Sequence, residues 1–349
     1  MKKFLSTLGA ITLVGSNVTS LVACNGKSET NKLPQQNNLE SLFYDKHNVF
    51  YKSAIWNNKL YVSGTKDDEK KFYELDLNDP NKKLNEIKVI NDEIWSLLIV
   101  NDELYAGTKY DGLYVINLND PKKQPEKIKG ISNWVDSLLV VNDELYVGGN
   151  NGLYVIKLND PKKQPNKNTI IPDNIPYEKI RLETISFYKD NFYIGLQTNY
   201  DQSKGKIYKL NIKTNNFSVF KEKDDKDNEF DTIYTSYVVK NKLYFHTRNS
   251  WYSTLENGKL YELDLDDSNK KPIEIKSINC AVWSLIAIND KLYVGGSGGL
   301  FVIELNDPKK QARKIFSEVI NYSITSLIID KKIMYITAKN GNIWKWLIK

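Results

Sequence analysis

Apolar and polar positions along this chain follow one short pattern that returns seven times. Each copy has an alternating apolar run, a tight polar turn, an apolar residue followed by Tyr, a second polar or Gly-rich turn, and another apolar-aromatic run. Alternation with a period of two predicts β-strands, and turn residues between the runs predict hairpins. Three copies are nearly identical in sequence: Asn101–Leu118, Asn142–Leu158 and Asn289–Leu305. The pattern therefore predicts an all-β chain built from repeated hairpins.

The Tyr of each copy marks the length of the repeat. Successive tyrosines are separated by 44, 41, 47, 51, 49 and 42 residues. Repeats of about 40–50 residues with several strands each are typical of β-propeller blades. We therefore predict a seven-bladed β-propeller over residues 39–349. The anchor tyrosines are Tyr61, Tyr105, Tyr146, Tyr193, Tyr244, Tyr293 and Tyr335.

The seventh copy is one strand short. Its three runs are Ser323–Ile329, Ile333–Ala338 and Ile343–Ile348, and the sequence stops at Lys349. The segment Leu39–Tyr51 precedes the first complete blade. We predict that part of this N-terminal segment forms the missing strand of the last blade and closes the ring, which removes exposed sheet edges.

We label the strands of each blade A to D in chain order. The A–B and C–D turns then lie on one face, the bottom face, and the B–C and D–A loops lie on the opposite top face. Pairs such as Asn101-Asp102 and Asn57-Asn58 suit the positive φ angles of a two-residue A–B hairpin. A closing D strand must run from bottom to top, so the N-terminal segment is expected to leave from the bottom face.

The N-terminus predicts export and lipidation. Lys2 and Lys3 precede an apolar stretch, and residues 1–23 read as a signal peptide rather than a stable membrane span. The sequence Leu21-Val22-Ala23-Cys24 resembles the bacterial lipobox, which implies cleavage before Cys24 and diacylation of its thiol. An ordinary signal peptide or a membrane anchor is the alternative. Residues 24–38 then form a lipidated, flexible polar tether. We expect the protein at the extracellular face of the cell membrane.

Composition narrows the possible partners. Cys280 is the only cysteine besides Cys24, so we expect no intramolecular disulfide in the mature chain. The 49 Lys and Arg against 43 Asp and Glu form too small an excess to indicate nucleic-acid binding. Heavy use of Lys, Asn and Ile together with the lipobox resembles surface lipoproteins of mollicute-like bacteria. The repeats themselves resemble those of bacterial two-component-regulator propellers, a resemblance that implies the fold and no ligand.

The C–D turns repeat an Asn-Asp-Pro motif followed by lysines. Asp caps its own backbone and Pro presets φ, so the motif forms turns, and its lysines keep them soluble. A functional interpretation is that the lysines face an anionic bilayer and hold the propeller with its bottom face toward the membrane, because each contributes about 1 kcal/mol near such a surface. These candidate membrane-facing residues are Lys82, Lys83, Lys122, Lys123, Lys162, Lys163, Lys270, Lys271, Lys309 and Lys310.

The copies differ most on the top face. Ten residues before each anchor Tyr, at the top of strand A beside the channel, stand Tyr51, Trp95, Asp136, Glu183, Tyr234, Trp283 and Thr325. Aromatic faces and two carboxylates could bind a sugar or an amine; alternatively, the aromatics pack between blades and the acids are solvated. The B–C loops of blades 4 and 5 are longer than the others and add Tyr200, Trp251 and Tyr252, and the charged stretch Gly64–Lys71 is expected to form the B–C loop of blade 1.

Little in the sequence points to catalysis. Only His47 and His246 are present, without metal-ligand spacing, so we expect no cofactor and no metal. Asp136 and Glu183 are the weak candidates for an acid–base pair. The sequence favours a top face that binds an extracellular glycan or protein. The alternatives are a carboxylate-dependent hydrolase or lyase acting in the channel, and a purely structural surface protein.

Overall fold

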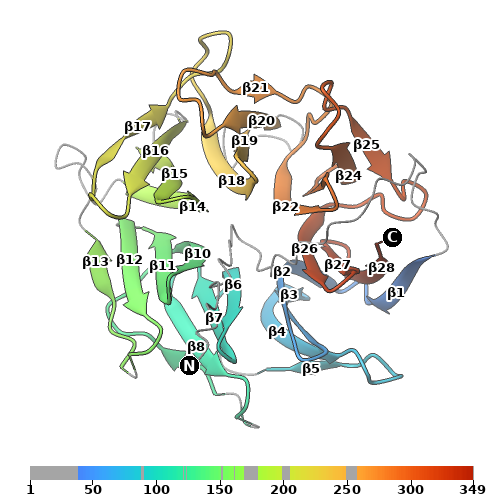
Figure 1. Ribbon diagram of the computed structural model, residues 1–349. Helices are drawn as coiled ribbons and strands as arrows, with labels where there is room; N and C mark the ends of the chain where they lie inside the picture. The colour runs from blue at the N-terminus through green and yellow to red at the C-terminus, as the bar shows by residue number, and fades with distance from the viewer. Residues whose placement is uncertain are drawn as a thin grey trace, which may run out of the picture.

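The computed structural model shows seven four-stranded antiparallel sheets arranged as blades around a central axis (Figure 1). It describes residues 38–87, 90–120, 122, 124–150, 152–160, 162–168, 180–198, 205–248 and 258–348. The fold is the predicted all-β, seven-bladed propeller. In A-to-D order, blades 1 to 3 are β2 (Asn48–Trp56), β3 (Lys59–Lys66), β4 (Glu69–Asp76) and β5 (Leu84–Glu86); β6 (Ile94–Val100), β7 (Glu103–Thr108), β8 (Leu113–Asn117) and β9 (Glu126–Lys127); β10 (Val135–Val141), β11 (Glu144–Gly149), β12 (Gly152–Lys157) and β13 (Asn166–Asn168).

Blades 4 to 7 follow the same order around the ring. They are β14 (Ile180–Tyr188), β15 (Asn191–Thr198), β16 (Gly205–Asn211) and β17 (Phe217–Lys221); β18 (Thr232–Val239), β19 (Lys242–Arg248), β20 (Gly258–Asp264) and β21 (Ile273–Glu274); β22 (Val282–Ile288), β23 (Lys291–Gly296), β24 (Gly299–Glu304) and β25 (Ala312–Ile315); β26 (Ile324–Asp330), β27 (Ile333–Ala338), β28 (Asn342–Leu347) and β1 (Leu39–Tyr44).

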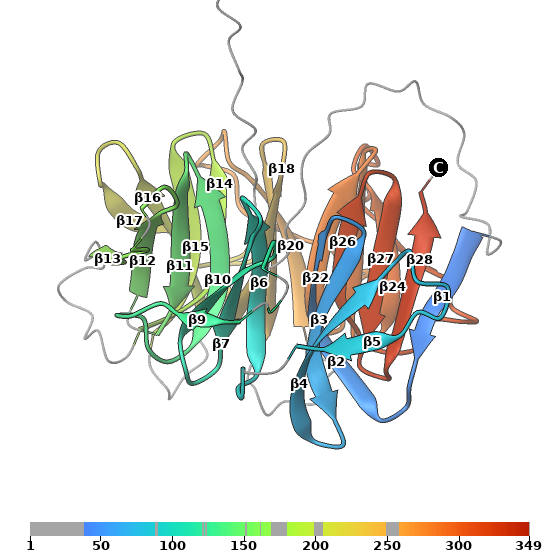
Figure 2. The ribbon, with the colours of Figure 1, turned by 90° about the horizontal axis from the view of Figure 1, so that it is seen from below.

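The N-terminal strand closes the ring as predicted. β1 pairs with β28, the C strand of the last blade, from Leu39 opposite Trp346 to Tyr44 opposite Asn342. The first and last parts of the described chain thus share one sheet, and β1 lies beside β28 in both views (Figures 1 and 2). β1 runs from the bottom face to the top face. It starts opposite Trp346, near the end of β28, and the antiparallel C strand β28 ends at the bottom face, so Leu39 lies at the same end as the A–B hairpins. Figure 2 is drawn with the bottom face uppermost.

Turn chemistry also matches the sequence. The A–B pairs Asn101-Asp102, Asn142-Asp143 and Asn289-Asp290 all have φ between 50° and 61°, the geometry of a type I′ hairpin. Blade 1 differs from expectation, because Gly64–Lys71 is not a loop. β3 and β4 continue through it and join at Asp67-Asp68, whose φ angles of 48° and 66° make another tight hairpin. Asp tolerates this left-handed backbone, so a charge-dense segment can still be a two-residue turn.

Packing between neighbouring sheets forms the core. All seven anchor tyrosines are buried, each at most 7% exposed. Near the axis, small hydroxyls link the innermost strands of adjacent blades, and Ser53 of blade 1 bonds Ser326 of blade 7 at 2.9 Å. Equivalent inter-blade contacts are Ser96 Oγ to Val135 O, Ser137 Oγ to Ile185 N, Thr184 Oγ1 to Ser236 Oγ, and Ser284 Oγ to Leu327 N. The hydroxyls are therefore a packing requirement of the inner ring. No helix among the described residues is long and apolar enough to cross a bilayer.

Candidate functional site

A β-bulge places one residue of each blade at the mouth of the channel. The pairing of strands A and B shifts by one residue at the same point in all seven blades, between Ile94 and Ser96 in blade 2 and between Val282 and Ser284 in blade 6, for example. A bulge re-aims the side chain of the extra residue. The seven bulged residues are those at the predicted ring position: Tyr51, Trp95, Asp136, Glu183, Tyr234, Trp283 and Thr325.

Arg181 joins the two ring carboxylates into a buried triad. Its Nε and Nη2 donate to Asp136 Oδ2 and Oδ1 at 3.0 and 2.8 Å. The same Nε lies 3.0 Å from Glu183 Oε1. The single Nε–H is directed at Asp136, so Glu183 gains proximity to the guanidinium without its hydrogen bond. All three residues are at most 9% exposed.

Burial controls how these carboxyls ionise. Removal from water raises the pKa of Glu183 to about 8, against the opposing attraction of Arg181. Burial also raises the pKa of Asp136, and Arg181 and Lys52 oppose that rise. Lys52 responds in the opposite sense, because burial lowers the pKa of its ammonium to about 8. The two acids are thus close together, as an acid–base pair would require, but a guanidinium contacts both.

A first aromatic cluster lies over blades 2 and 3 on the top face. The rings of Trp95 and Trp134 are 5.5 Å apart, and Tyr110 packs edge-on against Trp134 at 6.4 Å. Arg181 Cζ sits 3.8 Å from the Trp134 ring centroid and 5.0 Å from that of Trp95. Lys109 Nζ lies 5.3 Å from the Trp95 ring and pairs with Glu93 at 3.4 Å. Tyr110 is 57% exposed, so this cluster presents aromatic surface outward.

A second cluster occupies blades 5 to 7. Arg248 Cζ is 4.5 Å from the Tyr234 ring centroid and 5.0 Å from that of Trp283. Lys339 Nζ lies 4.6 Å from the same Trp283 ring. Burial and the nearby Arg248 lower the pKa of the Lys339 ammonium. Two cations therefore share one indole at the channel mouth.

Sequence reasoning found the ring but missed its cations. Lys109, Arg248 and Lys339 all stand four residues after an anchor Tyr, at the top of strand B. Counting forward from the tyrosines as well as backward would have revealed this position. Arg181 has no such signal, because no other copy has a cation two residues before its ring residue. The ring position itself also holds the half-buried Tyr51 and the buried Thr325.

Several candidate residues cannot be placed. Cys24, Lys123, Tyr200, Trp251 and Tyr252 lie outside the described residues. Among the described residues, no group of three or more His, Cys, Asp or Glu is arranged to hold a metal ion. His246 is buried, which lowers the pKa of its imidazole to about 3, and its Nε2 lies 3.2 Å from Cys280 O.

The described lysines of the C–D turns divide into three groups. Lys82, Lys163 and Lys310 have left-handed backbone with φ of 46–48°, and their ammonium groups fold back onto carbonyl oxygens at the end of strand C. Lys270 and Lys271 pair with Asp264 and Asp227 at 3.0 and 2.8 Å. The third set remains exposed, and no carboxylate of the described chain lies within ion-pair distance: Lys83, Lys122, Lys162 and Lys309.

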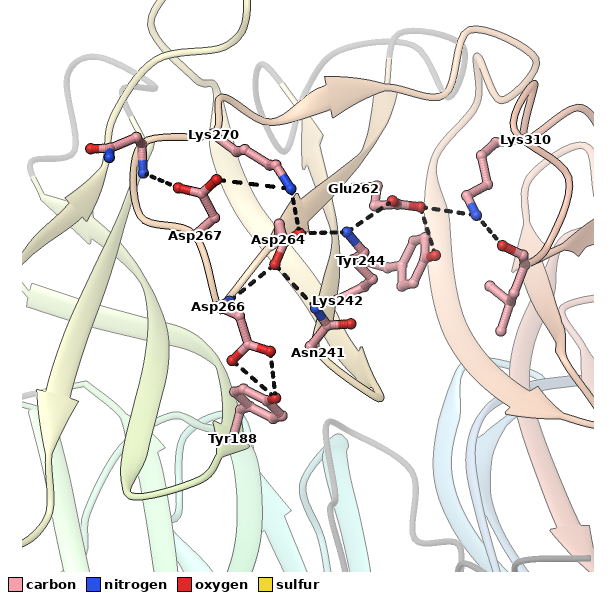
Figure 3. Close-up of polar contacts among 12 residues, drawn as sticks. Tyr188, Asn241, Lys242, Tyr244, Glu262, Asp264, Asp266, Asp267, Lys270 and Lys310 are labelled. Carbon is pink, nitrogen blue, oxygen red and sulfur yellow. Dashed lines mark hydrogen bonds and ion pairs between the residues drawn. The ribbon is translucent and has the colours of Figure 1, made fainter.

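The folded-back lysines also connect neighbouring blades. Lys310 of blade 6 approaches Glu262 of blade 5 at 3.5 Å, and Glu262 accepts a 2.7 Å hydrogen bond from the anchor Tyr244 (Figure 3). Figure 3 also shows Lys242 and Lys270 converging on Asp264, which holds the pKa of that carboxyl well below its usual range.

Blades 2 and 3 repeat the same connection. Lys163 of blade 3 lies 2.9 Å from Glu103 of blade 2, whose carboxylate accepts from the anchor Tyr105 at 2.6 Å. The two glutamates come from different strands, β7 and β20, but in both links a turn lysine approaches a carboxylate that accepts from an anchor Tyr of the neighbouring blade. Part of the lysine motif thus has a structural role, as a lock between adjacent blades.

A cleft of about 650 Å³ runs along the junction of blades 7 and 1. It lies at the outer side, between the closing strand β1 and strands β4 and β5, and contains none of the ring residues. Its walls include Tyr44, Asp45, Lys66, Tyr73 and Lys83. The sequence pattern does not indicate this cleft, because its walls come from β1 and from blade 1, which meet only when the ring closes.

Comparison with known proteins shows the fold. No family model and no curated protein matches the chain. Similar solved structures include the extracellular domain of BT4673 from B. thetaiotaomicron, with a TM-score of 0.64 and 14% identity over 88% of this chain. YCF48 bound to D1 peptide matches with a TM-score of 0.62 and 9% identity, over 91% of this chain and 100% of that chain. The Dos1 propeller matches with a TM-score of 0.58 and 15% identity, over 87% of this chain and 93% of that chain. The chain spans only 40% of the BT4673 domain.

We expect Lys163→Met to destabilise the propeller by about 1–3 kcal/mol, because it removes the ion pair with Glu103 and leaves the Leu158 carbonyl without its side-chain donor. The neighbouring Lys162→Met is the matched control and should change the free energy of unfolding by less than about 0.5 kcal/mol. Urea unfolding of residues 25–349, which hold all seven sheets, measures both. Equal effects would contradict the inter-blade lock.

We expect Glu183→Gln to remove a pH dependence from stability. Native Glu183 holds its proton up to a pKa of about 8, whereas the unfolded chain releases it near its ordinary value of 4.5. Wild-type stability therefore falls as pH rises through this window, because unfolding releases a proton there. The free energy of unfolding of the variant should be closest to that of the wild type near pH 5. Relative to the wild type, it should increase progressively up to pH 8.

Urea unfolding of both proteins at pH 5, 6, 7 and 8 gives the difference in unfolding free energy, in which other titrating groups cancel. A difference that stays constant across this range would show that Glu183 ionises in the native protein as it does in the unfolded chain.

Proposed function

We propose that this chain is a lipid-anchored surface protein whose propeller top face binds an extracellular protein ligand. The observation that carries the proposal is the channel mouth, where bulges present half-exposed aromatic side chains interleaved with cations. Aromatic residues and Arg are enriched in the energetically dominant contacts of protein interfaces. Trp134, Trp95 and the exposed Tyr110 supply such a surface over blades 2 and 3.

The geometry supports binding over catalysis. A hydrolase or lyase would need Asp136 and Glu183 to face a reacting bond between them. Arg181 Nε contacts both carboxyls at 3.0 Å and lies where that substrate would have to enter. The arrangement is a buried triad in which Arg181 holds the side chains of Asp136 and Glu183 in place.

The cations also favour a protein over a stacked sugar. Sugar recognition by aromatic stacking needs an open ring face. Arg181 lies over Trp95 and Trp134, and Arg248 lies over Tyr234 and Trp283. A buried guanidinium therefore covers one face of each of these rings, which leaves less ring surface for stacking on a sugar. YCF48, a propeller of similar fold, was solved with a bound peptide, which shows that the architecture can accept one.

The direction of the closing strand supports the proposed orientation. Leu39 lies at the bottom end of β1, so a tether from a lipidated Cys24 would reach the propeller at the bottom face. The top face would then point away from the membrane. The exposed turn lysines Lys83, Lys122, Lys162 and Lys309 are on the side that would face the lipid.

We expect the double variant Tyr110→Ala and Trp134→Ala to lose at least about ten-fold in affinity for a protein ligand, because it removes the exposed aromatic anchors. Residues 25–349 would be screened against arrays of extracellular proteins and glycans, and affinities for each hit measured by biolayer interferometry. The matched control combines Ile273→Ala and Leu347→Ala, which shorten exposed apolar residues elsewhere, 61% and 48% exposed.

Loss in the top-face variant alone, with an unchanged melting temperature, supports the proposal. Equal affinity in all three proteins, or binding confined to glycans, would contradict it. Turnover of a glycan abolished by Asp136→Asn would replace it with the hydrolase or lyase.

We expect residues 25–349 to bind vesicles that contain anionic lipid through the four exposed turn lysines. Each Lys→Gln substitution at 83, 122, 162 and 309 should weaken binding about five-fold, from roughly 1 kcal/mol per lysine. Vesicle co-sedimentation at several salt concentrations measures this. Lys206→Gln on the top face is the control and should leave vesicle binding unchanged. Binding that does not depend on the anionic lipid content of the vesicles would exclude the proposed orientation.

A further inference from the structure

Three hydrogen-bond donors gather at Trp283 in the second aromatic cluster. Arg248 and Lys339 both contact its ring, at 5.0 and 4.6 Å from the centroid. The indole Nε1–H of Trp283 is buried and has no acceptor within the described part of the chain. An unsatisfied buried donor costs about 1–3 kcal/mol. An acceptor supplied from outside would recover this loss.

The charges at the channel mouth also favour binding of an external acceptor. Four cations, Lys52, Arg181, Arg248 and Lys339, accompany the two ring carboxyls of Asp136 and Glu183. Asp136 is shared by Lys52 and Arg181, and Glu183 is attracted by Arg181 and Arg248. Lys339 has Arg248 as a second positive charge nearby, and no carboxylate of the described residues lies within ion-pair distance of its ammonium group. Burial, and then Arg248, lower the pKa of that ammonium.

We propose that Arg248, Lys339 and the Trp283 indole N–H form a subsite for a carboxylate of an acidic peptide on the protein ligand. The inference rests on the proposed function of the top face and names the chemistry recognised there. A guanidinium fork and an ammonium bind carboxylates through charge-assisted hydrogen bonds, and the indole adds a third donor. Arg248 lies over the Tyr234 and Trp283 rings, so the ligand would meet cationic donors beside these rings.

Lys109 provides an internal comparison. It occupies the same repeat position as Arg248 and Lys339 and also lies over a ring residue, Trp95. Unlike Lys339, it has a carboxylate of its own chain, Glu93, at 3.4 Å. The fold thus uses this position in blade 2 for an aromatic–cation contact that an acid completes. Lys339 has no such acid among the described residues, and the peptide would supply one.

The test uses two blocked decapeptides of equal length as probes, one with four Asp residues and one with four Asn residues in their place. Isothermal titration of residues 25–349 should show at least ten-fold tighter binding of the Asp peptide. Lys339→Met and Trp283→Phe should each reduce that preference at least five-fold, the second by removing the indole N–H. Lys206→Met is the matched control, because Lys206 is a top-face lysine already paired with Glu222 at 2.7 Å. It should keep the preference.

A second readout follows the lysine itself. The pKa of Lys339, measured by NMR on ¹³Cε-labelled lysine and assigned through Lys339→Met, should rise when the Asp peptide is added and stay unchanged with the Asn peptide. This measurement separates direct charge contact from a general effect of the substitution on the fold.

The outcomes distinguish the subsite from the wider proposal. Equal binding of both peptides, or a preference kept by Lys339→Met and Trp283→Phe, overturns the subsite but leaves protein binding by Tyr110 and Trp134 untouched. Absence of binding to either peptide also overturns it, and the array screen then tests the top face alone. An oligosaccharide of uronic acids is the third probe; if it binds more tightly than the Asp peptide, the carboxylate source is a glycan and the peptide class is wrong.

Discussion

The pairing of β1 with β28 is the constraint on which this structure depends. Six blades are each continuous in sequence, but the seventh needs a strand from the opposite end of the domain. Blades 7 and 1 also meet nearer the axis, where Ser53 and Ser326 on the innermost strands form a hydrogen bond. The channel mouth is a product of this closure, because its ring residues come from all seven blades.

Within the closed ring, one backbone irregularity serves seven different side chains. The bulge in strand A is the same in every blade, while its residue changes from Trp to Asp, Glu, Tyr or Thr. The repeated backbone therefore supplies position, and the variable residue supplies chemistry. Cations from the ends of strands then fill the spaces between these side chains. Arg181 ties Asp136 to Glu183, whereas Arg248 and Lys339 stack on aromatic rings. The same scaffold thus produces a neutralised sector and a positively charged one.

Most of the fold was predictable because it repeats. The anchor tyrosines gave the blade count, Asn-Asp pairs gave the hairpins, and a missing D strand gave the closure by Leu39–Tyr44. The ring residues were found by counting back from each Tyr, since the bulge occurs at a fixed distance. Arg181 was not predicted, because no other copy has a cation at this position and its contact with Asp136 forms only in the folded protein. The turn lysines share one motif, yet Lys163 folds onto Glu103 while Lys162 faces solvent, a difference set by the left-handed φ of Lys163. Gly64–Lys71 was expected as a loop because charge density resembles loop composition.

The direction of β1 has a mechanical consequence. A pull on residue 38 away from the bottom face acts along the axis of β1, parallel to the strand that it pairs with. Such a load acts on all the β1–β28 hydrogen bonds together, in shear, instead of opening them one at a time. A tethered propeller loaded in this way would resist drag as a single unit until the whole strand slides. The closing strand would then be both the fastener of the ring and the part of the domain that bears tension.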